Sequence, residues 1–135
     1  GNVIPPDSYD DATVQALMTE ANRYLGMPYT FGGTPPASFD CSAFVCWVFS
    51  NSGVHDLPRT TAQGIYDQCT PVSAADAKAG DIIFFTGTYN AGRPVTHVGI
   101  YCGNGTMVHC CDPIQYTSIN TSYWQSHFYG FGRLN

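Results

Sequence analysis

The chain of 135 residues is rich in apolar residues and poor in charge. Hydrophobic residues make up 44% of it and charged residues only 11%, with ten acids against five bases and a net charge of -5. A chain of this length buries one core but is too short for two. Because nucleic acids and anionic lipids are bound by clustered lysine and arginine, neither is an expected partner. No apolar stretch approaches the roughly 20 residues that span a bilayer.

The start of the chain is typical of the end of a linker. It begins with Gly1 instead of Met and continues as NVIPPDS, so we assign residues 1–8 to a linker remnant and residues 9–135 to one domain. Six cysteines are a high count, but their spacing forms no C-x-x-C pair of the kind that structural zinc sites use. We therefore expect no structural zinc. We also expect a monomer and no cofactor.

One amphipathic helix is expected near the start of the domain. Apolar residues recur from Val14 to Leu25 at helical spacing, and candidate N-caps lie at residues 8–11. Gly26 and Pro28 are expected to end this helix, the first as a left-handed C-cap and the second because proline cannot continue a helix.

A second helix is expected after a loop at residues 29–40 that is rich in glycine and proline. From Cys41 to Phe49 the chain is almost wholly apolar, and a run of this length fits a strand or a helix. Asp40 and Ser42 in front and the sequence NSG behind favour a buried helix with Cys41 in its first turn. A third short segment, RTTAQGIYDQC, follows.

The second half changes to short β-branched and aromatic runs separated by turn signals, a pattern that predicts strands. The expected strands are residues 81–87, 97–102, 106–111, 114–119 and 128–134. Helices first and strands afterwards predict an α+β fold, in which N-terminal helices pack on a C-terminal antiparallel sheet of five to six strands.

One hairpin decides whether two histidines share a face of this sheet. If a two-residue turn of Asn104 and Gly105 joins the strands, His97 and His109 face opposite sides. If the turn has three residues and includes Gly103, the two histidines are diagonal neighbours on one face. The sequence leaves both registers open, and only the second makes a site.

A thiol at the N-terminus of a helix has a chemical use. Unpaired N–H groups and the helix dipole favour the thiolate, which is the nucleophile. A nearby histidine handles the proton, and a third polar group holds that histidine in one orientation. Cys41, His97 and His109 fit these three roles. The residues alone also allow a structural interpretation, in which Cys41 is an inert core thiol and the histidines are edge residues of the sheet.

Several motifs together resemble a known family. The stretches YLGMPYTFGG, FDCSAFVCWVF, LPRTTAQG, AGDIIFF, HVGIY and GNGTMVH are similar, in order and spacing, to the NlpC-type family of bacterial cell-wall cysteine peptidases. The resemblance runs from about Tyr24 to the C-terminal GRL. It implies a papain-like fold and hydrolysis of peptidoglycan stem peptides, typically at the bond from γ-D-glutamate to the diamino acid (diaminopimelate or lysine) at the third position. It also implies a secreted or wall-associated enzyme, fused to an upstream wall-targeting or second lytic domain.

The resemblance assigns catalytic roles residue by residue. It makes Cys41 the nucleophile, His97 the base and His109 the third member that orients the base. It makes Tyr29 the partner of the oxyanion, together with the backbone N–H of Cys41. These roles require both histidines on one face, which favours the three-residue turn.

The resemblance also implies a substrate-binding set made of Asp40, Ser42, Arg59 and Thr60. Three of these residues have a structural alternative. Asp40 could serve only as an N-cap, Arg59 could be a surface residue in an ion pair, and Thr60 or the adjacent Thr61 could cap the next helix.

Two features and two competing functions stay open. Ala43 stands where the family usually has glycine after DCS, so we expect activity with the substrate fit in question. Cys111 lies across from His97 in the favoured register, which makes a redox lock with Cys41 a hypothesis beside simple packing. A non-catalytic wall-binding module and an amidase acting on the sugar-to-peptide link are the competing functions.

Overall fold

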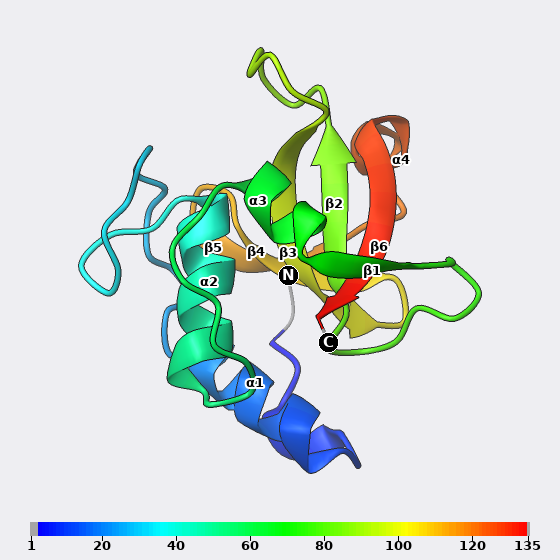
Figure 1. Ribbon diagram of the computed structural model, residues 1–135. Helices are drawn as coiled ribbons and strands as arrows, with labels where there is room; N and C mark the ends of the chain where they lie inside the picture. The colour runs from blue at the N-terminus through cyan, green and yellow to red at the C-terminus, as the bar shows by residue number, and fades with distance from the viewer. Residues whose placement is uncertain (1–2, 135) are drawn as a thin grey trace.

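The computed structural model describes residues 3–134. Its helices are η1 (Pro6–Ser8, a 3-10 turn), α1 (Ala12–Asn22), α2 (Cys41–Asn51), α3 (Ala62–Asp67) and α4 (Ser122–His127). Its strands are β1 (Cys69–Val72), β2 (Ile82–Thr86), β3 (Val95–Gly103), β4 (Thr106–Cys110), β5 (Ile114–Ser118) and β6 (Phe128–Leu134). Within these residues the strands form one six-stranded antiparallel sheet in the order β1-β6-β2-β3-β4-β5 (Figure 1), which confirms the expected α+β fold.

The five strands expected from the sequence are all present, each within two residues of its expected ends. Besides η1, two short elements were not expected. The first, β1, pairs with β6 at an edge of the sheet, where Pro71 is tolerated because an edge strand leaves one side without partners. The second, α4, lies between β5 and β6 and is capped by Thr121, whose hydroxyl accepts the N–H of Trp124.

Helix α1 begins where the sequence predicts and ends earlier. The side chain of Asp11 caps it by accepting the N–H groups of Thr13 and Val14. The helix ends at Asn22, so the expectation that Gly26 forms its C-cap is wrong. Gly26 does adopt a φ of 88°, but its N–H donates to the carbonyl of Ile114 in β5 at 2.9 Å, which ties the end of this segment to the sheet.

Part of the segment assigned to a linker is packed on the domain. Helix η1 lies within it, and the side chain of Ile4 packs against the core. The carbonyl of Ile4 also accepts a hydrogen bond from Asn22 Nδ2 at 3.4 Å. Residues 1–2 of that segment lie outside the described residues.

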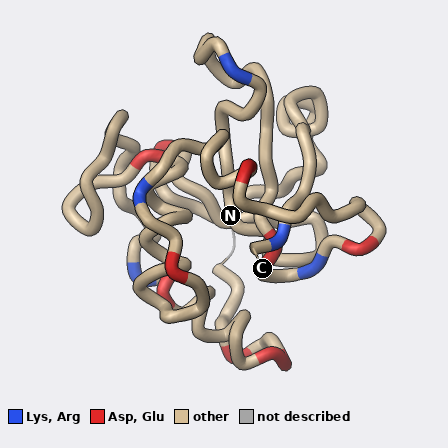
Figure 2. The backbone as a smooth tube through the Cα atoms, in the orientation of Figure 1, with Lys and Arg blue, Asp and Glu red and all other residues tan. Residues whose placement is uncertain are grey.

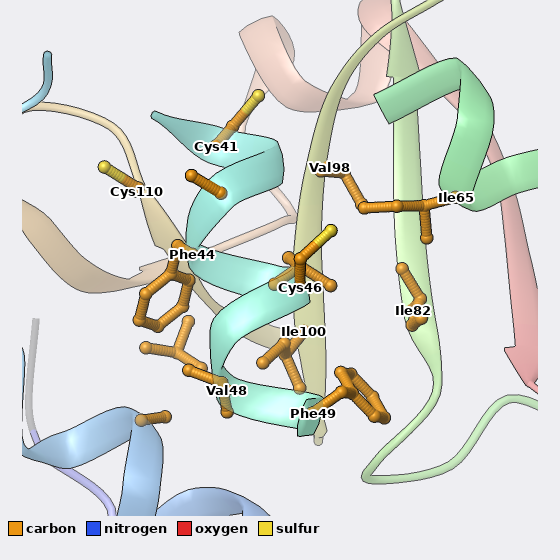
Figure 3. Close-up of a cluster of buried hydrophobic side chains, with 14 of the residues drawn as sticks. Cys41, Phe44, Cys46, Val48, Phe49, Ile65, Ile82, Val98, Ile100 and Cys110 are labelled. Atoms are coloured by element: carbon orange, nitrogen blue, oxygen red, sulfur yellow. The ribbon is translucent and has the colours of Figure 1, made fainter. Parts of the chain in front are cut away.

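Helix α2 is the buried helix that the apolar run predicts. Its side chains Phe44, Val48 and Phe49 are at most 4% exposed; Phe49 lies on the side of Ile100 of β3, and Phe44 points to the opposite side (Figure 3). A helix that is apolar on nearly all sides must be covered on nearly all sides. Contacts with β3, β4, α1 and α3 supply that cover and fix the position of its N-terminus relative to the sheet.

The turn between β3 and β4 has two residues. Asn104 and Gly105 have φ values of 52° and 73°, the left-handed pair that a tight hairpin turn requires, and Gly103 pairs with Thr106. The expected three-residue turn is therefore wrong.

A β-bulge nevertheless puts the two histidines on one face. Between Tyr101 and Gly103 the register shifts by one residue, because Cys102 is the extra residue of the bulge, and Tyr101 then pairs with Met107. This shift cancels the effect of the shorter turn. His97 and His109 consequently face the same side of the sheet, with their rings 5.1 Å apart.

The two faces of the sheet bury different side chains. The face that we call the helix face packs against α1, α2 and α3 through an apolar set that includes Ile82, Phe84, Val98, Ile100 and Val108. The opposite face, which we call the histidine face, carries a smaller apolar cluster that includes Ile83, Phe85, Met107 and Phe131. His97 pairs with Phe85 and lies beside this smaller cluster. Charged residues are few and scattered over the described chain, without a basic patch (Figure 2).

Candidate active site

Cys41 is the first residue of α2 and lies where this helix meets β3. Asp40 caps the helix, since its Oδ1 accepts the backbone N–H of Ala43 at 2.8 Å. Cys41 is 7% exposed, and its thiol lies against the backbone amides of Val98 and Ser42. Val98 directly follows His97 in β3, so the thiol lies beside the strand that carries the histidine (Figure 3).

Burial controls the protonation of Cys41. It raises the pKa of this thiol to about 12, and the Asp40 carboxylate raises it as well, while the amides of Val98 and Ser42 and the guanidinium of Arg59 lower it. The amides at the helix N-terminus do favour the thiolate, as the sequence predicts, but burial outweighs them in the free protein. The desolvation of the Cys41 thiolate costs more free energy than its interactions with two backbone amides and the Arg59 guanidinium recover. Cys41 is a protonated thiol at neutral pH.

The two histidines form a buried hydrogen-bonded pair. His97 Nε2 and His109 Nδ1 are 2.8 Å apart, and the residues are 8% and 1% exposed. Burial lowers the pKa of His97 to about 4. Burial also lowers the pKa of His109 well below its usual range, and the neighbouring His97 lowers it further. Both rings are therefore neutral at pH 7. Because the two neutral rings share a hydrogen bond, a change of charge on one ring polarises the other.

Trp124 of α4 covers the histidine pair. Its ring is stacked on His97, with centroids 5.2 Å apart and planes at 28°, and meets His109 edge to face at 5.3 Å. The same indole packs on Phe85 at 4.7 Å. The short helix that the sequence did not predict thus seals the histidine face at the point where the two rings lie.

Two cavities flank the site, and Tyr29 lines both. One, the nucleophile-side cavity, has a volume of about 190 Å³ and contains Cys41. The other, the histidine-side cavity, has a volume of about 290 Å³ and contains His97 and Trp124. Burial raises the pKa of Tyr29 above its usual range, and the Cys41 and Asp40 groups raise it further, so its phenol stays a hydrogen-bond donor. Tyr29 therefore lies on the walls of both cavities, and its role as oxyanion partner stays a prediction.

Asp40, Ser42 and Arg59 form one hydrogen-bonded group beside the nucleophile. Arg59 Nη2 pairs with Asp40 Oδ2 at 2.9 Å, and Arg59 Nη1 donates to Ser42 Oγ at 2.9 Å. Ser42 Oγ in turn donates to Asp40 Oδ1 at 3.0 Å, and the N–H of Gly32 donates to Asp40 Oδ2 at 3.1 Å. The structural alternatives and the site interpretation are therefore compatible. Asp40 is an N-cap and Arg59 is in an ion pair, and both also line the nucleophile-side cavity.

Thr60 and Thr61 have separate places. Thr61 caps α3, with its hydroxyl accepting the N–H of Gly64 at 3.0 Å, and it lines the nucleophile-side cavity. Thr60 is not among the residues that line this cavity. Its hydroxyl packs over Gly64, where an added Cβ would lie only 2.1 Å from Oγ1. The wall position expected for Thr60 is thus occupied by its neighbour.

The remaining candidates lie beside the site. Ala43 is fully buried and lines a cavity with Trp47 and Leu57, but neither of the two cavities that flank Cys41. All six cysteines are free thiols. Cys110 is fully buried and lies at the same end of α2 as Cys41, with its Sγ donating to the carbonyl of Phe39 at 3.5 Å (Figure 3). The redox lock between Cys41 and Cys111 stays a hypothesis.

The sequence missed several residues of this site, among them Arg93 and Thr117, and Asp112 and Trp124 in the histidine-side cavity; Thr61 was expected only as a possible helix cap. Thr117 Oγ1 lies 2.8 Å from His109 Nε2, a neighbour that the register of β4 and β5 would have revealed. For Trp124 the signal was a tryptophan in an otherwise polar segment. A larger cavity of about 630 Å³, between α1 and the end of β6, contains none of the candidate residues. Across residues 3–134, no cluster of three or more His, Cys, Asp and Glu side chains has the arrangement of a metal site.

Comparison with known proteins finds close relatives over most of the chain. Residues 26–133 match the NlpC/P60 family. The chain is 45% identical to the bifunctional muramidase/DL-endopeptidase CwlT of Bacillus subtilis over 89% of its length, and 42% identical to the probable endopeptidase p60 of Listeria innocua over 88%. It spans 36% and 24% of those proteins. The crystal structure of a lipoprotein-like NLP/P60 family protein from Staphylococcus aureus superposes with a TM-score of 0.87 at 48% identity, covering 93% of this chain and 42% of that one.

Proposed function

Because the chain belongs to the NlpC/P60 family, we propose that it is the catalytic domain of a thiol-dependent endopeptidase that cleaves the stem peptides of peptidoglycan. The observation that carries the proposal is the buried His97–His109 pair, with its 2.8 Å contact, on the strand beside the thiol of Cys41. Relatives named as DL-endopeptidases and as a γ-DL-glutamyl hydrolase support the reaction class.

The neutral thiol and the neutral imidazole define the order of events. His97 Nε2 is occupied by His109, which leaves His97 Nδ1 to take the Cys41 proton as the sulfur attacks the substrate carbonyl. The oxyanion that forms is stabilised by the backbone N–H of Cys41 and the phenol of Tyr29. The imidazolium then protonates the leaving amine, the C–N bond breaks, and water hydrolyses the thioester with His97 as base.

The two cavities match the two halves of the proposed bond. The leaving amine must meet His97, so the third residue of the stem peptide enters the histidine-side cavity, where Asp112 is the charged side chain on the wall. A diamino acid brings a second amino group, which is a cation. The γ-D-glutamyl part enters the nucleophile-side cavity, where Arg93 lies on the wall and suits its free α-carboxylate. Charge complementarity on both sides thus supports cleavage between γ-D-glutamate and the diamino acid.

The proposed substrate implies an enzyme that works in or on the cell wall. A secreted or wall-associated protein with an upstream targeting or lytic domain agrees with the share of the relatives that this chain spans. In the part of the chain that the structure describes, no helix has the length and apolarity to cross a bilayer.

Mass spectrometry of digested muropeptides tests the proposal. The wild type is incubated with purified muropeptides that contain either lysine or diaminopimelate, beside the variants Cys41→Ser and Cys69→Ser. Cys69 is a half-buried thiol at the sheet edge and serves as the matched control. We expect fragments split after D-glutamate from the wild type and the control, and none from Cys41→Ser. Full activity of Cys41→Ser would refute the thiol mechanism, a split at the sugar would indicate the amidase, and no cleavage by any protein would indicate the binding module.

A further inference from the structure

The His97–His109 pair has two proton arrangements, and only one of them serves a base. Each neutral imidazole carries one ring proton, and one of the two nitrogens in the 2.8 Å contact must donate. If His97 Nε2–H donates to His109 Nδ1, then His97 Nδ1 is a free lone pair that can accept a proton. If His109 Nδ1–H donates instead, His97 carries its proton on Nδ1 and has no lone pair for Cys41.

The arrangement that leaves His97 Nδ1 free requires a hydrogen-bond acceptor at His109 Nε2. With His109 Nδ1 as acceptor, the ring proton of His109 sits on Nε2, and that N–H needs an acceptor of its own. The atom at 2.8 Å is Thr117 Oγ1. A threonine hydroxyl has two acceptor lone pairs and one donor proton, so it can accept this N–H and direct its own proton elsewhere.

The need for an acceptor at His109 Nε2 becomes stricter during the reaction. Once the Cys41 proton has moved to His97, that ring is an imidazolium with protons on both nitrogens. His109 must then accept at Nδ1 and donate at Nε2, and Thr117 must accept. The charged state of His97 is therefore stabilised in part through the chain of contacts that ends at the threonine hydroxyl.

On the His109 side of this contact water has little access, although Thr117 itself is half-buried. His109 is 1% exposed, and the indole of Trp124 lies against both histidine rings. An N–H buried in such a place without an acceptor is costly. The register explains how the acceptor arrives there: Met107 pairs with Thr117 and His109 with Gln115, so Thr117 is the diagonal neighbour of His109 on the histidine face.

We propose that Thr117 is a positioning residue, which holds the His97–His109 pair in the arrangement that leaves His97 Nδ1 free to take the proton of Cys41. The inference rests on the proposed thiol mechanism and extends it from three side chains to four. Thr117 does not touch the reacting atoms and acts only through His109.

The experiment compares Thr117→Val with Thr117→Ser. Valine keeps the branched shape that suits a strand but loses the acceptor, whereas serine keeps the acceptor and loses a methyl group. Three quantities are measured: the ¹⁵N chemical shifts of both histidine rings, the pH profile of Cys41 alkylation by iodoacetamide, and kcat and KM on muropeptides. In the alkylation the thiol proton passes to His97, a C–S bond forms, and iodide leaves with the electrons of the C–I bond.

We expect the wild type to show both histidines protonated on Nε2. Thr117→Val should lower kcat and the alkylation rate about 10- to 100-fold, the range for leaving one buried donor unpaired, and should change KM less than about twofold. Thr117→Ser should stay within about threefold of the wild type in all three readouts.

Three results overturn the proposal. One is a wild-type ¹⁵N spectrum that shows His97 protonated on Nδ1. This measurement uses only the wild type, so it does not depend on whether a variant folds. Another is a Thr117→Val protein with wild-type alkylation and ¹⁵N shifts. The third is a Thr117→Ser protein as impaired as Thr117→Val, which would assign the effect to packing. Alkylation and NMR require no muropeptide, so they give an answer even if the proposed hydrolysis is not observed.

Discussion

Neighbouring residues of β3 face two different environments. Val98 and Ile100 point to the helix face, where both are fully buried among apolar side chains of α2 and the sheet. His97 points to the histidine face, where it is also buried but lines a cavity and meets a second histidine and an indole. The alternation of a strand thus lets one short segment supply both the core and the chemistry. Stability should depend mainly on one face and activity on the other.

The largest effect on activity is expected from His97→Ala on the histidine face. Loss of the proton acceptor should lower kcat about 100- to 10,000-fold, because general acid–base catalysis contributes that much. The free energy of unfolding should also fall, because the variant removes a buried ring and leaves His109 without its partner, so kcat is compared for molecules that stay folded. Steady-state hydrolysis of muropeptides and urea unfolding at pH 7.5 measure the two quantities. A variant that keeps more than a tenth of the wild-type kcat would contradict the assignment of His97 as base.

The converse effect is expected from Ile100→Ala on the helix face. Emptying this buried site should lower the free energy of unfolding by about 2–5 kcal/mol, and Ile100→Val by about 0.5–1.5 kcal/mol. The kcat of the molecules that stay folded should lie within about twofold of the wild type. Activity measured at a temperature well below the unfolding midpoint checks this. If kcat falls in proportion to stability across the two variants, the faces are not independent.

A smaller effect is expected of pH on the free energy of unfolding, and we expect it to arise from the two histidines of the histidine face. The pKa of His97 is lowered from 6.5 to about 4 by burial, so between these values the unfolded chain binds a proton that the folded chain does not. Stability therefore rises with pH across this window and is lost on acidification below about 6.5, by up to about 1.4 kcal/mol per pH unit for this histidine. His109 is shifted in the same direction and adds to the slope.

Urea unfolding at pH 7.5 and pH 5.0 measures this slope. We expect His97→Gln to reduce the loss of stability at pH 5.0, and Ile100→Val to leave it unchanged, since the isoleucine does not titrate. Equal slopes for His97→Gln and the wild type would show that His97 is not held neutral in the folded protein.

Local signals in the sequence were sufficient for most elements of the fold. The Asp40 cap and the apolar run after it predict a buried helix with Cys41 at its start, and the structure has that helix from Cys41 to Asn51. The five β-branched and aromatic runs predict strands within two residues of the observed ends. These features depend on residues close together in the chain, and such residues carry their own turn, cap and periodicity signals.

Elements with weak local signals were missed. Helix α4 has only six residues and a polar sequence, and Trp124 is needed there because of what lies beneath it on the sheet. Strand β1 has four residues with a proline and exists because β6 offers it an edge. Neither segment would be stable alone, so a pattern along the chain could not reveal them.

The sequence by itself determined the order of the elements, the place of Cys41 at a helix N-terminus and the residue types of the site. The tertiary structure decided the rest. The bulge at Cys102 puts His97 and His109 on one face despite a two-residue turn, and burial keeps Cys41 protonated against the pull of the helix dipole. The reason is common to both: register and desolvation depend on contacts between segments far apart in the chain, and no local pattern contains them.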